Sequence, residues 1–281
     1  MFSKCIYPLN ATIRFFLVLL VSVTGPVMAA DPEAERWNTL KPGFFADREI
    51  IADDVISLEA PKRAHDSAIV PIVIHAQDDA RKIKSVHLIV DKNPLPLAGV
   101  FKFSEKKRSA WQSLETRIRI NEYTHVRAVA ELDDGSLHMT SKFVKAAGGC
   151  SAPAMADHDL ALANAGKMRI LLDDISNTDK VAASLPPDER ATSEATIKIS
   201  HPNNSGMQFD QISRNYIPAF FVHSIVAELD GEELLNVETN FSMSENPVVR
   251  FQFADAGTAD KLKVFAVDSK DNRYEQSLIQ Q

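Results

Sequence analysis

The first half of the chain contains short apolar segments of strand length, separated by turn-forming residues. They lie at residues 55–58, 69–74, 86–90, 100–103, 114–120 and 126–132. Apolar and polar positions alternate through the last segment, and Leu137 and Met139 continue the alternation after the turn residues 133–136. A period of two predicts strands, and these two segments predict a β-hairpin. Since no long helical periodicity accompanies them, the pattern favours an all-β fold.

A second series of strand-length segments begins after residue 165. Its members are residues 168–172, 195–199, 220–229, 233–237, 248–253, 262–267 and 274–279. Asp230-Gly231 and residues 270–272 predict hairpin turns between them. Each half has the strand number and the length, about 100 residues, that are typical of an immunoglobulin-like antiparallel β-sandwich. We expect two such domains in tandem, at 50–145 and 166–281, although one larger barrel or sandwich would use the same strands.

Residues 146–165 show no strand pattern and are rich in alanine and glycine. This composition is typical of an interdomain linker, here with a short helical turn around residues 157–165. We therefore expect a flexible connection between the two sandwiches, and Cys150 lies in it.

The beginning of the chain differs from the rest. Lys4 and Arg14 precede or border an apolar run at 15–23, and Val27-Met28-Ala29 supplies the small residues of a cleavage site. This order predicts a secretory signal peptide over residues 1–29. The apolar run is shorter than the roughly 20 residues that a membrane span needs. We therefore expect an exported, soluble mature chain without membrane contact, with an uncleaved anchor as the alternative.

Charge argues against nucleic acid as a partner. The 281 residues include 31 Lys and Arg and 38 Asp and Glu, which gives a formal net charge of −7 at pH 7. Binding to a phosphate backbone requires a positive surface, which this composition does not favour. Hydrophobic residues make up 45% of the chain, an ordinary share for a globular protein, so extensive disorder is not expected.

Cys150 is the cysteine that remains once the predicted leader, which contains Cys5, is removed. In an oxidising compartment cysteines normally pair, so an odd one is an intermolecular partner or a reactive thiol. Gly148 and Gly149 precede it and give the backbone wide freedom. We expect an exposed, mobile, reactive thiol on an arm made flexible by these glycines, and a small buried hydrophobic residue is the alternative.

Other chemistries find little support in the sequence. A blue-copper site needs histidine and then methionine after its cysteine, whereas here Met155 precedes His158. No two histidines have the spacing of three to five residues that is common in metal sites. The motifs of serine hydrolases, zinc proteases and nucleotide-binding loops are absent, and a catalytic pair of Cys150 and His158 would need a rigid support. We therefore expect no catalytic residue, no metal and no cofactor.

Two sets of residues resemble a known family. In the first half they are residues 56–61, Val70-Pro71-Ile72, the run Lys92-Asn93-Pro94-Leu95-Pro96-Leu97-Ala98, Thr116-Arg117-Ile118 and Gly148-Gly149-Cys150. In the second half they are His201-Pro202, Ser205-Gly206, residues 217–221, Asn246-Pro247 and the closing hairpin. With these residues, the chain from about 55 to 150 resembles the Y subunit of the bacterial sulfur-oxidation (Sox) carrier, and the chain from about 166 onward resembles its Z subunit.

The resemblance implies a carrier protein that is not an enzyme. In the family, the Y cysteine lies on a swinging arm, accepts a thiosulfate-derived group as a covalent adduct and presents it to periplasmic enzymes. Carried over by position, Cys150 is the attachment residue, and Gly148 and Gly149 supply arm flexibility. The resemblance further implies a periplasmic location, redox or hydrolytic enzymes of sulfur oxidation as partners, and Y-like and Z-like halves that pack together in one chain or between copies.

The fused chain departs from the family pattern at the arm. The family arm ends the Y chain, whereas here Ser151 and Ala152 follow and the chain continues. Fused chains of this kind resemble SoxYZ-like carriers associated with quinoprotein dehydrogenases. A second hypothesis is therefore a non-catalytic accessory or binding module of a periplasmic quinoprotein dehydrogenase system, in which Cys150 is incidental or forms an intermolecular disulfide. A third, an electron-transfer copper protein, would require a bound metal.

Overall fold

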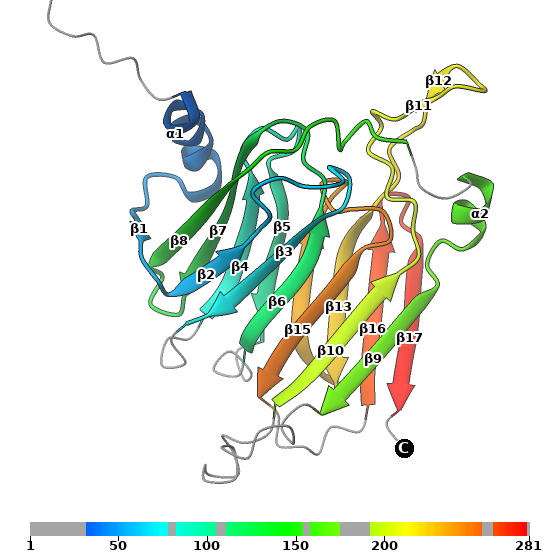
Figure 1. The fold of residues 1–281 in the computed structure, drawn as a ribbon. Coiled ribbons are helices and arrows are strands. Elements are labelled where there is room, and N and C mark those ends of the chain that lie inside the picture. Colours follow the sequence, from blue (N-terminus) through cyan, green and yellow to red (C-terminus); the bar gives the residue numbers. More distant parts are fainter. Residues whose placement is uncertain are drawn as a thin grey trace, which may run out of the picture.

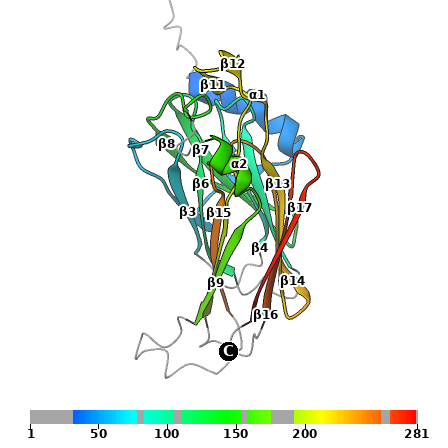
Figure 2. The ribbon, with the colours of Figure 1, turned by 90° about the vertical axis from the view of Figure 1, so that its right-hand side faces the viewer.

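The structure is a computed structural model that describes residues 32–77, 83–104, 111–153, 158–174, 192–254 and 261–279. The predicted signal peptide at 1–29 lies outside these residues. Strands account for most of the described chain, accompanied by helices α1 (Pro32–Phe45) and α2 (His158–Ala163). Figure 1 shows the strands side by side in one broad molecule, and Figure 2 shows that they form two layers.

One layer is a nine-stranded sheet. Its order is β1 (Ile50–Ala52), β8 (Leu137–Val144), β7 (Thr124–Leu132), β4 (Ile83–Val90), β5 (Leu97–Phe103), β14 (Glu232–Thr239), β13 (Val222–Leu229), β16 (Lys261–Asp268) and β17 (Arg273–Ile279). Neighbours in it are antiparallel except β1 and β8, which are parallel.

The other layer has six strands, in the order β2 (Ile56–Glu59), β3 (Val70–Ala76), β6 (Trp111–Ile118), β15 (Val248–Ala254), β10 (Thr192–Ile199) and β9 (Met168–Asp174). All its neighbours are antiparallel. A short hairpin of β11 (Phe209–Asp210) and β12 (Asn215–Tyr216) stands apart from both layers.

The two halves of the chain extend each other's sheets. In the nine-stranded sheet β5 pairs with β14, and in the six-stranded sheet β6 pairs with β15. The prediction of an all-β fold from two immunoglobulin-like antiparallel sandwiches is confirmed, and the structure adds that both layers run continuously from one half into the other (Figure 1). The domain boundaries expected from the sequence stay predictions.

The hydrophobic core fills the space between the layers and also spans both halves. Alternate residues of β16 are buried, as its sequence pattern requires, and Val264 belongs to the same cluster as Leu88 and Ile118 of the first half. Burying a side chain of this size contributes about 1.5–3 kcal/mol. Because one cluster serves both halves, the boundary between them is part of the core.

Helix α1 was not predicted from the sequence. Its Trp37 and Phe45 pack on Ile89, Val129 and Leu137, which face away from the main core. A helix with few apolar positions and an internal proline gives a weak periodic signal in the sequence. Packing against the sheet therefore stabilises α1 more than its own sequence pattern does. By contrast, the short helical turn expected near residues 157–165 is present as α2.

The loops that matter for function gather at one end of the sandwich. Figure 1 shows the connection from β8 toward α2 crossing this end from the first half to the second, where the β11–β12 hairpin projects. We call residues 145–153 of this connection the arm. The loop that leads from β10 to β11, residues 200–208, belongs to the second half and meets the arm there.

Candidate functional site

Cys150 is completely buried in the structure. Its exposed fraction is 0%, and it is a free cysteine. The backbone oxygen of Cys150 accepts a hydrogen bond from Ser205 Oγ of the second half. The expectation of an exposed thiol is therefore wrong for this conformation, because the second half supplies a cover that the local composition of the arm does not reveal.

The two glycines before Cys150 are held by hydrogen bonds. The Gly148 and Gly149 amides donate to the backbone oxygens of Asn121 and Ile120, at 2.8 and 2.9 Å. Gly148 has a φ of +80°, and a Cβ on Gly149 would lie 2.0 Å from the oxygen of Ser67. In this conformation the glycines permit a left-handed turn and a close approach of two backbones. Arm flexibility from Gly148 and Gly149 stays a prediction.

Arg119 lies beneath the arm and connects it to the second half. It follows β6, is 1% exposed, and donates from Nη1 to the oxygen of Gly149 at 3.2 Å and from Nη2 to the oxygen of Asn203 at 3.4 Å. Its Nε has no hydrogen-bond partner among the described residues. Sequence reasoning missed Arg119, since an isolated arginine after a strand carries no signal of burial.

The surroundings of Cys150 suppress its reactivity. Burial raises the pKa of the thiol to about 11, although the positive charge of Arg119 opposes the shift. At pH 7 a thiol with this pKa is ionised in about one molecule in ten thousand. Because the thiolate is the nucleophile, this burial lowers the reactivity of Cys150 in the present conformation.

A group of buried polar side chains of the second half is connected to the cysteine through Ser205. The oxygen Oε1 of Gln208 accepts from the Ser205 amide at 3.0 Å, and Ser205 in turn holds Cys150. Gln208 Nε2 and Asn204 Oδ1 are buried without a hydrogen-bond partner in the described part of the chain. These residues follow His201-Pro202, and the run of Asn203, Asn204 and Ser205 is the signal that could have identified them.

His201 stabilises the conformation of the loop at residues 200–208. Its Nδ1 accepts from the Asn203 amide at 3.1 Å, and its ring lies 4.3 Å from that of Phe220. Burial lowers the pKa of His201 to about 4, against the opposing effect of Asp268, whose Oδ2 is 3.7 Å from Nε2. His201 is therefore neutral near pH 7 and orients the loop through a hydrogen bond.

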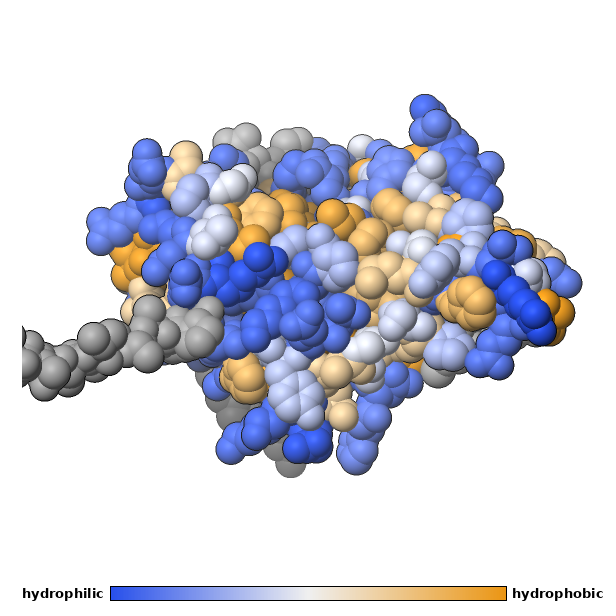
Figure 3. Space-filling view, turned by 90° about the horizontal axis from the view of Figure 1, so that it is seen from above, coloured by the Kyte–Doolittle hydropathy of each residue, from blue (hydrophilic) through white to orange (hydrophobic). Residues whose placement is uncertain are grey.

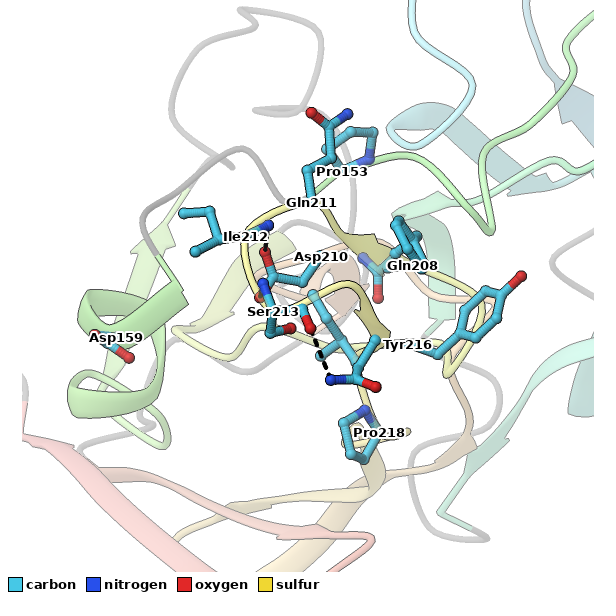
Figure 4. Close-up of a pocket in the computed structure, with 12 residues that line it drawn as sticks. Pro153, Asp159, Gln208, Asp210, Gln211, Ile212, Ser213, Tyr216 and Pro218 are labelled. Carbon is cyan, nitrogen blue, oxygen red and sulfur yellow. Dashed lines mark hydrogen bonds between the residues drawn. The ribbon is translucent and has the colours of Figure 1, made fainter.

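An open cavity of about 750 Å³ lies next to the arm. It is lined by Pro153 of the arm, Gln208, Asp159 of α2 and the β11–β12 hairpin. Figure 4 shows Ile212 on the side of the hairpin toward α2 and Tyr216 on the opposite side. Ile212 is 95% exposed and Tyr216 67%. Figure 3, which looks onto this end of the molecule, shows apolar residues gathered among polar ones.

No group of three His, Cys, Asp or Glu side chains with metal-binding geometry occurs among the described residues. Met155, which the copper hypothesis needs, lies outside them. The helices described in the structure include none that is long and apolar enough to span a membrane.

Two family models match the chain in succession. The model for the sulfur oxidation protein SoxY matches residues 41–150, and the model for the sulphur oxidation protein SoxZ matches residues 186–278. The chain belongs to the SoxY and SoxZ families, fused in one polypeptide. Both are families of sulfur-oxidation carrier proteins. The SoxY match ends at Cys150, so the arm up to its cysteine belongs to the SoxY half, and Asn203, Ser205 and Gln208 come from the SoxZ half.

Solved structures resemble the chain more distantly. The sulfur carrier protein SoxY from Chlorobium limicola f thiosulfatophilum is 18% identical, with a TM-score of 0.35, over 41% of this chain and 94% of its own. The superoxide reductase (neelaredoxin) from Ignicoccus hospitalis T24K is 14% identical, with a TM-score of 0.28, over 34% of this chain and 93% of its own. A comparison with curated proteins found no match.

Proposed function

We propose that the chain is a periplasmic carrier that holds a thiosulfate-derived sulfur group on the thiol of Cys150 and presents it to partner enzymes. The observation that carries the proposal is the position of Cys150, which ends the SoxY match and lies where the SoxY and SoxZ halves meet. It is also the one cysteine of the described residues. The sandwiches then act as a rigid support for the arm.

Loading would be an oxidative coupling. The Cys150 thiol loses its proton, its sulfur bonds to the outer sulfur of thiosulfate, and two electrons pass to an electron-accepting partner enzyme. The product is Cys–S–S–SO₃⁻, which carries one negative charge. The closed thiol is almost entirely protonated, so loading requires the arm to open first.

The cost of opening the arm follows from its hydrogen bonds. Four hydrogen bonds hold residues 148–150 of the arm in place, from the Gly148 and Gly149 amides, the Ser205 hydroxyl and the Arg119 guanidinium. At about 0.5–1.5 kcal/mol each, they favour the closed form by a few kcal/mol. This free energy is within the range measured for local opening in folded proteins. The arm can therefore leave the boundary between the two halves while both sandwiches stay folded.

The arm is tied to the fold at both ends, at β8 and at α2. A doubly tethered segment can enter an open cleft as a loop, but it cannot thread a narrow tunnel as a free chain end can. We therefore infer partner enzymes whose active sites open to the surface as clefts.

The first test is the intact mass of the protein isolated from the periplasm without reductant, with peptide mapping of Cys150. We expect an added sulfane or sulfonate-terminated group on Cys150, and none on the Cys150→Ser variant. A free thiol that persists after incubation with thiosulfate and the loading enzymes would contradict the carrier function.

A second candidate function is an accessory module of a periplasmic quinoprotein dehydrogenase. The observation that favours it is the open cavity beside the apolar, exposed hairpin, a surface suited to protein contact. In that case Ile212→Asp would abolish binding to the dehydrogenase while Cys150→Ser retained it. If Cys150 is the carrier, Cys150→Ser abolishes function whatever the effect at Ile212.

A further inference from the structure

The guanidinium of Arg119 is a buried cation whose described hydrogen bonds reach only backbone oxygens. Nη1 and Nη2 bind the oxygens of Gly149 and Asn203, and Nε has no hydrogen-bond partner among the described residues. A buried arginine is normally stabilised by direct contact with an anion, because its desolvation is costly. Burial lowers the pKa of Arg119, and the charges of Cys150, Glu245 and Asp66 oppose this shift.

A second unpartnered donor belongs to the second half of the chain. Gln208 is 0% exposed, and its Nε2 donates to no described residue. Its Oε1 accepts from the Ser205 amide, and the Ser205 hydroxyl donates to the oxygen of Cys150. Arg119 binds the preceding residue, Gly149. The two side chains with spare donors are therefore both connected to the arm next to Cys150, Arg119 of the first half directly and Gln208 of the second half through Ser205.

We propose that Arg119 and Gln208 form an anion-binding site for the oxygen atoms of a sulfonate-ended group attached to Cys150. This inference rests on the proposed function and specifies the class of cargo that the closed arm prefers. The free thiol leaves the spare N–H groups unused, whereas a sulfonate presents three oxygen acceptors on a short disulfide. The cavity lined by Gln208 and Pro153 lies beside this position and gives the larger group access to open space.

The preference has a physical basis. A hydrogen bond between a charged donor and a charged acceptor is about twice as strong as a neutral one. Inside a protein the weak screening enlarges this difference. An anionic adduct on Cys150 therefore stabilises the closed arm more than a neutral adduct of the same length does. Removal of the sulfonate by a partner enzyme would remove this stabilisation and favour the open arm.

Two small thiol reagents provide a matched test on the full mature chain. Tetrathionate converts the thiol into Cys–S–S–SO₃⁻ and releases thiosulfate and a proton. Methyl methanethiosulfonate converts it into Cys–S–S–CH₃ and releases methanesulfinic acid. The two adducts differ only in the terminal group. Loading takes place in dilute urea, which opens the arm, and the urea is then removed by dialysis.

We expect the sulfonate adduct to unfold at a temperature several degrees above that of the methyl adduct, and to protect residues 145–153 more strongly from hydrogen exchange. In Gln208→Leu both differences shrink, and in Arg119→Met they disappear. Arg119→Met removes a buried residue and tests the fold as well, so the comparison of adducts in the unaltered chain and in Gln208→Leu decides the question. Equal melting temperatures, or greater protection by the methyl group, would overturn the anion site.

This test is independent of the native cargo. The reagents load Cys150 without any partner enzyme, so a missing sulfonate preference would refute the anion site even when native protein carries sulfur on Cys150. Conversely, a clear sulfonate preference in a protein that never carries a native adduct would leave the anion site standing and refute the carrier function.

Discussion

At the scale of single residues, Cys150 is controlled by burial and by a neighbouring cation that act in opposite directions. Burial raises the pKa of the thiol and Arg119 lowers it, and burial has the larger effect. The result is a cysteine that stays protonated near neutral pH in this conformation. A thiol protected in this way resists oxidation, because oxidants react with the thiolate.

The raised pKa of Cys150 predicts a loss of stability in alkali. The folded chain keeps the thiol proton up to a pKa of about 11, whereas the unfolded chain releases it near the ordinary value of 9.0. The unfolded state therefore binds fewer protons in this window, and the free energy of unfolding falls as the pH rises from about 9 to 11. The loss is about 2–3 kcal/mol.

Urea unfolding across that pH range checks the prediction, with Cys150→Ser as the control. Tyr274 also has a raised pKa, because burial and Asp268 oppose its ionisation, and it contributes to both proteins. The difference between the two proteins therefore isolates Cys150. A difference that does not change with pH would show that the thiol is not buried in solution.

At the scale of elements, the arm is a loop whose conformation is fixed by two glycines with different tasks. Gly149 allows two backbones to touch, and Gly148 adopts a left-handed conformation in open space. A Cβ is unfavourable at both positions, but only at Gly149 would it collide with a neighbouring residue. Substituting the two glycines separately therefore distinguishes the effect of close packing of the arm from the effect of backbone strain within it.

Gly149→Ala is expected to dislodge the arm. Its Cβ would overlap the Ser67 oxygen, which belongs to the backbone and cannot rotate away, so we expect a loss of about 1–3 kcal/mol and faster alkylation of Cys150 by iodoacetamide. Gly148→Ala meets no atom within 4 Å and costs only the left-handed strain, about 1–2 kcal/mol. Equal alkylation rates in Gly149→Ala and the unaltered chain would mean that the arm does not pack on Ser67.

The elements also show how far the sequence predicts the structure. Alternating patterns located the strands, and Asp230-Gly231 predicted a turn in which both residues have positive φ, 51° and 83°. Local patterns indicate which residues are buried, but they do not indicate which other residues they pack against. For that reason the sequence missed Arg119, the cover that Ser205 and Gln208 place over Cys150, and the packing of α1.

At the scale of the whole molecule, the two halves are joined by strand pairing rather than by a hinge. The β5–β14 and β6–β15 pairs carry both sheets across the boundary. Phe251 of the SoxZ half lies opposite Leu114 of the SoxY half, and both are fully buried. We infer that the halves unfold together in one transition, because neither can lose its partner without exposing core and strand edges.

A cut chain should therefore stay assembled. A protease site inserted at residues 154–157, between the arm and α2, would be cleaved without separating the halves, which we expect to elute together in size-exclusion chromatography. The cut would also turn the arm into a free end, and alkylation of Cys150 should be faster than in the uncut chain. Elution as two separate fragments would show that the paired strands do not hold the halves together.

The continuity of the sheets has a further consequence for the protein in dilute solution. Two separate subunits that share such a boundary dissociate on dilution, and each then presents unpaired edge strands to the solvent. In a single chain the same pairing is unimolecular, so its strength is independent of protein concentration. The cysteine consequently keeps its cover even when molecules of the carrier are few and far apart.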